Sequence, residues 1–369
     1  MTRNSTYLDY NATTPLKPAA TAAMHAAMDV IGNPSSVHGF GRAARKIVED
    51  ARAAIAHNLG VRPAQVVFTS GGTEANHLAL LSRPQMPCFI SAVEHDCVLA
   101  ARSDAIRIPV DANGIVNTTW LEAELKKLGK PALVAVMLAN NETGVIQPIK
   151  QVADIVHAHG GLLHVDAAQA FGKVPMNMIL LDADTLTLSA HKCGGPKGVG
   201  ALVLRDNIGI EPMLRGGGQE QRRRSGTENV IGIAGFGAAV GTFIEDLVYT
   251  SHLIHWRKAF EEKILSVAPH AVIYGRDVQR LPNTSYIAMP GVTAETQLMA
   301  FDLDGIAVST GAACSSGKVK PSHVLQAMGI ADTAAGEAVR ISSGFATQAR
   351  DYEAAAAAWL ALYQRKQVA

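Results

Sequence analysis

Short apolar runs alternate with amphipathic segments along the first two hundred residues of the chain. Seven of these runs have the length and composition of strands, and they begin at Val66, Cys88, Ile106, Ala132, Leu162, Thr185 and Val199. Between them apolar residues recur at helical spacing, as Val152, Ile155 and Val156 do in the segment 149–159. Strands that alternate with helices are typical of a parallel sheet covered by helices. The pattern therefore predicts an α/β fold with a mainly parallel seven-stranded sheet.

The pattern changes after about residue 230. Residues 231–267 are helical for longer than is usual in a globular protein, with small residues first and charged residues later, and we interpret them as a connector. Short strands at 271–274, 284–289 and 338–342, a helix at 295–301 and an alanine-rich helix from Arg350 follow it. We predict a large domain over residues 16–255, a smaller α/β domain over 256–369, and an N-terminal segment, 1–15, that joins the small domain.

Composition restricts the class of partner. The 369 residues are 48% hydrophobic, enough for about two domains, and 33 Lys and Arg against 32 Asp and Glu give a net charge of +1. This balance gives no reason to expect nucleic acid or an anionic membrane as partner, and it suits a small neutral or zwitterionic substrate. The start lacks an apolar signal core and no apolar run reaches about 18 residues, so we expect a cytoplasmic protein.

A lysine between two apolar runs is the strongest candidate for chemistry. Lys192 follows His191 and precedes several glycines, in a segment that ends one predicted strand and begins the next. A lysine that must lose its proton and form an imine is best held on a short rigid turn beside apolar strands. The segment therefore predicts Lys192 as the attachment site of pyridoxal 5'-phosphate (PLP).

Other polar residues stand where predicted strands end. Gly72 and Thr73 open a helix after the strand at 66–70, and such N–H groups can hold a phosphate, although a plain tight turn also explains the glycine. Asp166 ends a buried strand, where it could pair with a protonated pyridine nitrogen or, alternatively, face solvent or cap a helix. His95 and Asn141 also follow strands, the place where open α/β sheets bind ligands. His95 could stack on a flat ring and move protons, or be an ordinary packed histidine.

Eight motifs occur in a fixed order along the chain. They are Tyr7-Leu-Asp-Tyr-Asn-Ala-Thr-Thr-Pro, Gly32-Asn-Pro-Ser-Ser-Val-His-Gly, Gly71-Gly-Thr-Glu-Ala-Asn, Asn140-Asn-Glu-Thr-Gly, His164-Val-Asp-Ala-Ala-Gln, Ser189-Ala-His-Lys, Arg224-Ser-Gly-Thr-Glu-Asn and Gly311-Ala-Ala-Cys-Ser-Ser. With these motifs the chain resembles, over nearly its whole length, the cysteine desulfurases of the NifS/IscS type. Those enzymes belong to the class V aminotransferase group of PLP enzymes, so the resemblance implies PLP-dependent transferase fold type I.

The resemblance also implies roles for individual residues. Lys192 would form the imine with PLP, Asp166 would face the pyridine nitrogen, and His95 would stack on the ring. The other cofactor contacts implied are Gln169 to the phenolic oxygen, Gly72, Thr73, Ser189 and His191 at the phosphate, and Thr227 at the phosphate of a neighbouring subunit. Arg340, helped by Asn141, would bind the substrate carboxylate, since a guanidinium gives two parallel bonds. The chain is therefore expected to form a homodimer.

Four cysteines, Cys88, Cys97, Cys193 and Cys314, are scattered without a Cys-x-x-Cys pair, which argues against a disulfide framework or a structural zinc site; we expect no metal. Cys314 stands among small residues and glycines that let a loop move, and we predict it as the nucleophile rather than a buried inert thiol. A free thiol with a pKa of about 8.5 needs activation for this. Cys97 is a second candidate, although helical packing explains it equally well, and Cys193 and Cys88 are interpreted as packing residues.

The predicted reaction converts L-cysteine to L-alanine and leaves the sulfur on Cys314 as a persulfide, with His95 as proton shuttle. The persulfide would pass to an acceptor protein, an iron–sulfur scaffold or a factor of another sulfur-transfer pathway such as tRNA thiolation. Selenocysteine lyase or small-amino-acid aminotransferase activity on the same PLP scaffold is the alternative. A catalytically silent sulfur-relay or scaffold protein is a third hypothesis, which the presence of Lys192, Asp166 and Cys314 disfavours.

Overall fold

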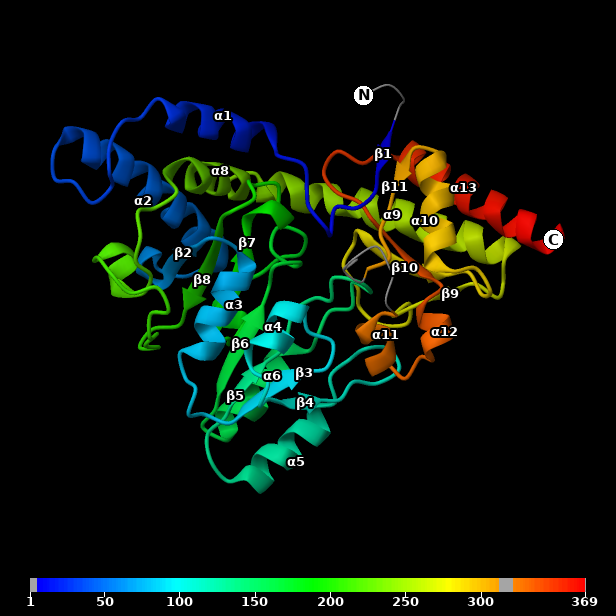
Figure 1. The fold of residues 1–369 in the computed structure, drawn as a ribbon, viewed down its shortest axis with the longest axis horizontal. Helices are drawn as coiled ribbons and strands as arrows, with labels where there is room; N and C mark the ends of the chain where they lie inside the picture. Colours follow the sequence, from blue (N-terminus) through cyan, green and yellow to red (C-terminus); the bar gives the residue numbers. More distant parts are fainter. Residues whose placement is uncertain (1–4, 312–320, 369) are drawn as a thin grey trace.

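A seven-stranded sheet forms the centre of the larger part of the computed structural model, which describes residues 5–311 and 321–368 (Figure 1). Side by side, the strands are β2 (Val66–Thr69), β8 (Gly200–Leu204), β7 (Thr185–Ser189), β6 (Leu162–Asp166), β5 (Leu133–Ala135), β3 (Cys88–Ser91) and β4 (Ile106–Ile108). The neighbours from β7 to β4 are parallel, and β8 is antiparallel to both β2 and β7. The predicted mainly parallel sheet is confirmed.

Helices cover both faces of this sheet. They are α1 (Pro18–Met28), α2 (Gly39–Leu59), α3 (Gly72–Leu81), α4 (Asp96–Ala101), α5 (Thr118–Leu128), α6 (Ile149–Ala158) and the short α7 (Met178–Leu181). In β3, Phe89 packs in the cluster formed with α2, α5 and α6, whereas Cys88 and Ile90 pack with α3 and α4. Because successive strand residues point to opposite faces and both faces are buried, the strands read as continuous apolar runs.

The carboxyl ends of six strands lie along one edge of the sheet. The parallel strands β3, β4, β5, β6 and β7 end together, and β2 joins them because two antiparallel steps through β8 restore its direction. Loops that leave these ends meet at the same edge, where open α/β sheets bind ligands. The chain therefore brings residues that are far apart in sequence to one place.

A second, smaller sheet lies beside the large one. Its strands are β12 (Ala338–Ser342), β10 (Thr284–Ala288) and β9 (Val272–Ile273), all antiparallel. The helices α10 (Ala294–Leu303) and α13 (Ala349–Val368) pack here around a core that includes Ile287, Phe301 and Trp359. The short helices α11 (His323–Ala327) and α12 (Asp332–Ala335) lie nearby, and β1 (Thr6–Tyr7) pairs with β11 (Ile306–Ala307), so the N-terminal segment reaches this part.

The predicted connector consists of two helices rather than one continuous helix. They are α8 (Val230–Val240) and α9 (Phe243–Val267), which meet at an angle of 57°. The glycines of α8 allow close packing on α1 and α2, since a Cβ on Gly235 would lie 2.7 Å from Met24 Cγ and one on Gly237 would lie 2.6 Å from Ala51 Cα. Figure 1 shows α9 leading to the smaller sheet. Because α9 crosses residue 255 without a break, the boundary between 16–255 and 256–369 stays a proposal.

No single helix in the described ranges has the length and apolar character needed to cross a membrane. The bent pair α8 and α9 meets both criteria only when its two helices are counted together.

Candidate active site

A cavity of about 240 Å³ lies at the carboxyl ends of the parallel strands. Most of its lining residues are predicted site residues, namely Gly72, Thr73, His95, Asn141, Asp166, Gln169, Ser189, His191 and Lys192. The others are Cys97, the second candidate for the reactive thiol, and four residues without a predicted role, Asn76, Met137, Ala139 and Ala168. The fold thus brings together residues from the ends of five strands, as the position of each after its strand predicts.

Lys192 lies in a short 3-10 turn, Ala190–Lys192, directly after β7. Its Nζ donates to the backbone oxygens of Asn11, at 2.6 Å, and Ala12, at 3.0 Å. Burial, and after it the positive charge of Arg340, lowers the pKa of Lys192 to about 8. A larger fraction of this amine is therefore neutral at physiological pH than in an exposed lysine, which is the state that attacks a carbonyl carbon.

Asp166 is the last residue of β6 and is 7% exposed. Its Oδ2 accepts a bond of 2.7 Å from Asn76 Nδ2, and its Oδ1 accepts one of 2.9 Å from the backbone N–H of Ala168. Both donors are neutral groups, and a buried carboxylate is stabilised most by a cation in direct contact. A protonated pyridine nitrogen in the cavity would supply that cation.

Two residues without a predicted role orient Asp166: Asn76 bonds to it directly, and His164 bonds to Asn76. Asn76 is 1% exposed, and its Oδ1 lies 2.9 Å from Nε2 of His164, whose Nδ1 lies 2.8 Å from Thr185 Oγ1. Since the Asn76 amide nitrogen donates to Asp166, its oxygen accepts from His164 Nε2, and Nδ1 accepts from Thr185. Burial lowers the pKa of His164 to about 4, so the ring is neutral, as this pattern requires. The helical spacing of Asn76 from Thr73 and the strand spacing of His164 from Asp166 are the signals that indicate both residues.

The first turn of α3 offers donors for an anion. Gly72 and Thr73 begin this helix, and Ser189 and His191 lie opposite at the end of β7. A Cβ on Gly72 would come within 3.4 Å of Ser189 Cβ, so glycine keeps this end of the cavity open. Burial, followed by the charge of Lys192, lowers the pKa of His191 to about 4. Helix N–H groups, two hydroxyls and a neutral imidazole form a cradle suited to a phosphate.

Gln169 is held by a lysine and an asparagine with no predicted role. Its Nε2 donates to the backbone oxygen of Asn11 at 2.8 Å, and its Oε1 accepts from Lys173 Nζ at 2.7 Å. Lys173 Nζ also donates to Asn11 Oδ1 at 2.9 Å. Burial, with the charges of Lys192 and Arg340 added, lowers the pKa of Lys173 well below its usual value. The bond from Lys173 to Oε1 thereby fixes the orientation of the Gln169 amide, with Nε2 as its donor.

Arg340 lies just outside the cavity, in β12, and is 3% exposed. Its Nη1 donates to the backbone oxygen of Asn141 at 3.0 Å, and its Nη2 donates to Asp9 Oδ1 at 2.7 Å. Its Nε is buried and has no acceptor among the residues that the structure describes. The guanidinium therefore contacts Asn141, a residue that lines the cavity, and is held in place by Asp9. It retains a donor for a ligand.

Comparison with known proteins identifies the family. The Aminotransferase class-V family matches residues 6–354. The chain belongs to the class-V aminotransferase family. It is 41% identical over 362 residues to a cysteine desulfurase of Cereibacter sphaeroides, with 94% of this chain and 92% of the relative covered. It is 38% identical over 364 residues to the cysteine desulfurase IscS of Dictyoglomus turgidum, with 95% and 92% covered.

The solved structures of class-V relatives agree with this assignment. The NifS-like protein from Rickettsia africae superposes with a TM-score of 0.89 at 37% identity, covering 98% of this chain and 100% of the relative. The predicted fold type I and the predicted class of enzyme, a PLP-dependent cysteine desulfurase, are confirmed by these relatives. The roles of individual residues stay predictions.

The cavity fits PLP, the general cofactor of the class-V family. Gly72 and Thr73 of the phosphate cradle follow β2, the carboxylate of Asp166 ends β6, and Lys192, with its lowered pKa, follows β7, which lies between β2 and β6 in the sheet. Lys192 would hold the cofactor covalently, Asp166 would bind its ring nitrogen, and Gln169 would donate to its phenolic oxygen. The chemistry of the donor set therefore matches each part of the cofactor.

Replacement of Arg340 by alanine is expected to raise KM for L-cysteine by roughly 10- to 100-fold, because charge-assisted bonds to a carboxylate contribute about 1.5–3 kcal/mol. Initial rates of alanine formation over a range of cysteine concentrations would measure this. The matched control Arg340→Lys keeps the charge but not the planar guanidinium, so its KM should lie between those of the wild type and Arg340→Ala. A wild-type KM in the alanine variant would contradict the assignment.

Like Arg340, the predicted residue Thr227 does not line the cavity of this chain. Thr227 is exposed and lies in the loop before α8, so its predicted contact, with the phosphate of a neighbouring subunit, stays a prediction. Cys314 lies outside the described residues. Cys193, beside Lys192, is 6% exposed and donates weakly to Ala190 O at 3.2 Å. Burial raises the pKa of Cys193 to about 12, which fits the predicted packing role.

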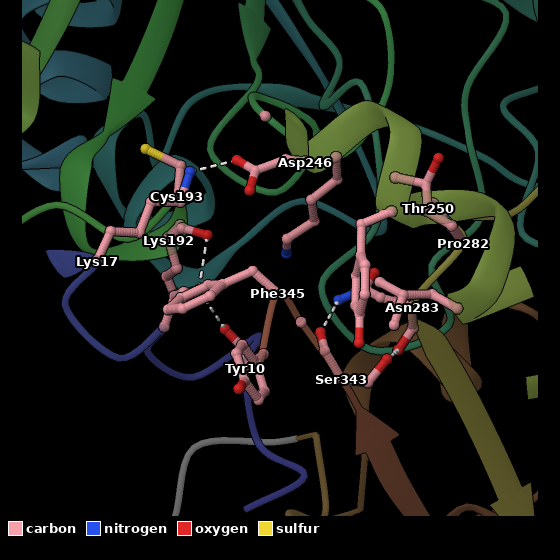
Figure 2. A pocket seen from close by; sticks show the side chains of 16 residues that line it. Tyr10, Lys17, Lys192, Cys193, Asp246, Thr250, Pro282, Asn283, Ser343 and Phe345 are labelled. Atoms are coloured by element: carbon pink, nitrogen blue, oxygen red, sulfur yellow. Dashed lines mark hydrogen bonds and ion pairs between the residues drawn. The ribbon is translucent and has the colours of Figure 1, made fainter. Parts of the chain in front are cut away.

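A second, smaller cavity of about 50 Å³ adjoins Lys192 (Figure 2). Figure 2 shows Asn283 and Ser343 on one side, where Asn283 Nδ2 donates to Ser343 O at 2.8 Å, and the ion pair of Lys17 and Asp246 on another. Gly344 packs on the ring of Tyr10, where a Cβ would lie 2.1 Å from a ring carbon. These residues support the N-terminal segment whose carbonyl groups hold Lys192.

Proposed function

We propose that this chain converts L-cysteine to L-alanine and transfers the sulfur to Cys314 as a persulfide. The observation that supports this most is the cavity at the carboxyl edge of the sheet, where Lys192, Asp166 and His95 meet. The relatives named cysteine desulfurase support the reaction class. A solved class-V relative, SspA, was obtained in complex with cysteine and is 30% identical to this chain with a TM-score of 0.80, which supports cysteine as substrate.

The bound cofactor would supply an electron sink for the α-carbon of the amino acid. The residues of the chain position the reactants around it. Arg340 and Asn141 hold the substrate carboxylate, which fixes the direction of the α-C–H bond. Lys192, whose lowered pKa increases the neutral fraction of its amine, takes the α-proton.

The later steps take place at the substrate sulfur. His95 moves a proton there. The thiol of Cys314 gives up its proton and attacks the substrate sulfur as the bond from that sulfur to Cβ breaks; the electron pair of this bond stays with the carbon skeleton, which takes up protons as alanine forms. The carbon skeleton leaves as alanine, and Cys314 keeps the sulfur as a persulfide. We further propose that the chain acts as a homodimer in which Thr227 of each subunit binds the phosphate of the other, and that the persulfide passes to an acceptor protein of iron–sulfur assembly, as the name of the IscS relative suggests.

The test is incubation of the purified chain and PLP with L-cysteine, followed by measurement of alanine and peptide mass spectrometry of all four cysteines. Sulfur is expected on Cys314. In Cys314→Ser the cofactor should still bind, persulfide should disappear, and alanine formation should fall by about 10²-fold, the scale for loss of a catalytic group.

Three results would contradict the proposed function. Sulfur found on Cys97 instead of Cys314 would identify Cys97, which lines the cavity, as the nucleophile. Pyruvate-dependent turnover without sulfur release would indicate an aminotransferase, and turnover limited to selenocysteine would indicate a lyase; the relatives favour neither alternative.

A further inference from the structure

Cys97 lines the cavity beside the histidine that is assigned to proton transfer. It lies in the first turn of α4, and His95 is the residue that caps this helix. The Cys97 Sγ lies 3.1 Å from His95 Nδ1 and 3.3 Å from Asn76 Nδ2. The thiol therefore sits between His95 and the asparagine that also holds Asp166.

The donors around Cys97 determine the direction of these bonds. Asn76 Nδ2 can only donate, and the Thr73 hydroxyl also bonds to the thiol and lowers its pKa as a donor does, so the sulfur accepts from both and the S–H is left to donate toward His95 Nδ1. The backbone N–H of Cys97 also points to His95 Nδ1, at 3.2 Å. Because the backbone N–H can only donate, Nδ1 is the acceptor and carries no proton, and the neutral ring has its proton on Nε2.

Cys97 is held as a protonated thiol rather than as a nucleophile. Burial, followed by the negative charge of Asp166, raises the pKa of Cys97 to about 11, so the S–H is retained at neutral pH. His77 Nε2 lies 3.0 Å from the Cys97 carbonyl oxygen and donates to it, which anchors the backbone. A protonated, anchored thiol suits a hydrogen-bond donor and argues against the hypothesis of a second reactive cysteine.

We propose that Cys97 is a positioning residue that holds His95 in the tautomer with the proton on Nε2. The bonds continue from Cys97 through Asn76 to Asp166 and His164, so one network orients both the carboxylate for the cofactor nitrogen and the imidazole. The proposal rests on the proposed function for the part that His95 plays, but the tautomer itself is a property of the folded protein.

The test is ¹⁵N NMR of the cofactor-loaded enzyme with labelled histidine, in which His95→Gln identifies the His95 signals. The two ring nitrogens are expected to show the Nε2–H tautomer in the wild type and in Cys97→Ser, whose hydroxyl can donate in place of the thiol. In Cys97→Ala, and in Cys97→Val, which preserves more of the volume, the backbone N–H bond to Nδ1 remains but the S–H bond is lost, so a minor population of the second tautomer is expected. Alanine formation should slow about fivefold in these two variants and recover in the serine variant, as for loss of one hydrogen bond.

Unchanged His95 signals in the alanine and valine variants would overturn the proposal. So would loss of the Nε2–H pattern in Cys97→Ser. A wild-type enzyme that shows the expected tautomer but makes no alanine from cysteine would contradict the proposed function and leave the role of Cys97 in positioning the ring supported.

Discussion

Replacement of Lys192 by alanine is expected to lower the rate of alanine formation by on the order of 10⁴-fold, because the same amine is assigned both to hold the cofactor and to take the α-proton. Its neutral form depends on burial next to Arg340, which lowers the pKa of Lys192 to about 8. Reduction of the loaded protein with borohydride, followed by peptide mass spectrometry, should place a pyridoxyl group on Lys192 in the wild type. The variant should carry none.

Lys197 provides a matched control for this experiment. It lies five positions further along the same glycine-rich segment, is exposed and does not line the cavity. Lys197→Ala should therefore stay within about twofold of the wild-type rate, as surface substitutions usually do. Covalent cofactor and a wild-type rate in Lys192→Ala would show that another amine does this work, and the half-buried Lys173 would be the next candidate.

The sequence predicts the half of the site that depends on the large sheet. Each strand appears as a local apolar run, and parallel strands place the residues after their carboxyl ends at one edge. Lys192, Asp166, His95 and Asn141 follow from that rule, and the structure brings them into one cavity. Their chemistry is also visible in the residue types, since few side chains other than lysine and aspartate could serve an imine and a pyridinium.

The other half comes from the N-terminal segment and could not be predicted in the same way. Asn11 contacts Lys192, Gln169 and Lys173, and its Nδ2 donates to Thr284 Oγ1 at 2.9 Å, so it joins residues that are far apart in the chain. Hydrophobic periodicity indicates helices and strands, but it does not indicate contacts between residues that are far apart in the sequence. The motif that begins at Tyr7 indicates that the segment matters, but its role depends on how the chain returns from the smaller sheet to the large one.

The expectation of one continuous connector helix was wrong for a related reason. The apolar and small residues of 231–240 have a helical pattern that continues into the next segment, so the sequence alone favours one helix. The structure bends where α8 must follow α1 and α2 while α9 must reach the smaller sheet. Tertiary packing thus overrides the local preference, and the glycines of α8 are explained by contact with those two helices rather than by flexibility.

Replacement of Asp166 by alanine is expected to lower kcat by about 10³-fold with the cofactor still bound through Lys192. Removing one member of a buried ion pair costs about 3–5 kcal/mol, and the ring nitrogen would lose the charge that keeps it protonated. Asp166→Asn should be nearly as damaging, although it has the same shape. Both carboxylate oxygens accept from N–H groups, of Asn76 and Ala168, so an amide would have to point its own N–H₂ at one of these donors.

Asn76→Ala separates the charge of Asp166 from its orientation. This variant keeps the carboxylate but removes the bond of 2.7 Å from Asn76, so a loss of only about five- to tenfold in kcat is expected, with the visible band of the cofactor preserved. Steady-state rates and absorption spectra of the three variants measure both effects. A larger loss in Asn76→Ala than in Asp166→Ala would mean that orientation outweighs charge, and the assignment of Asp166 to the ring nitrogen would be wrong.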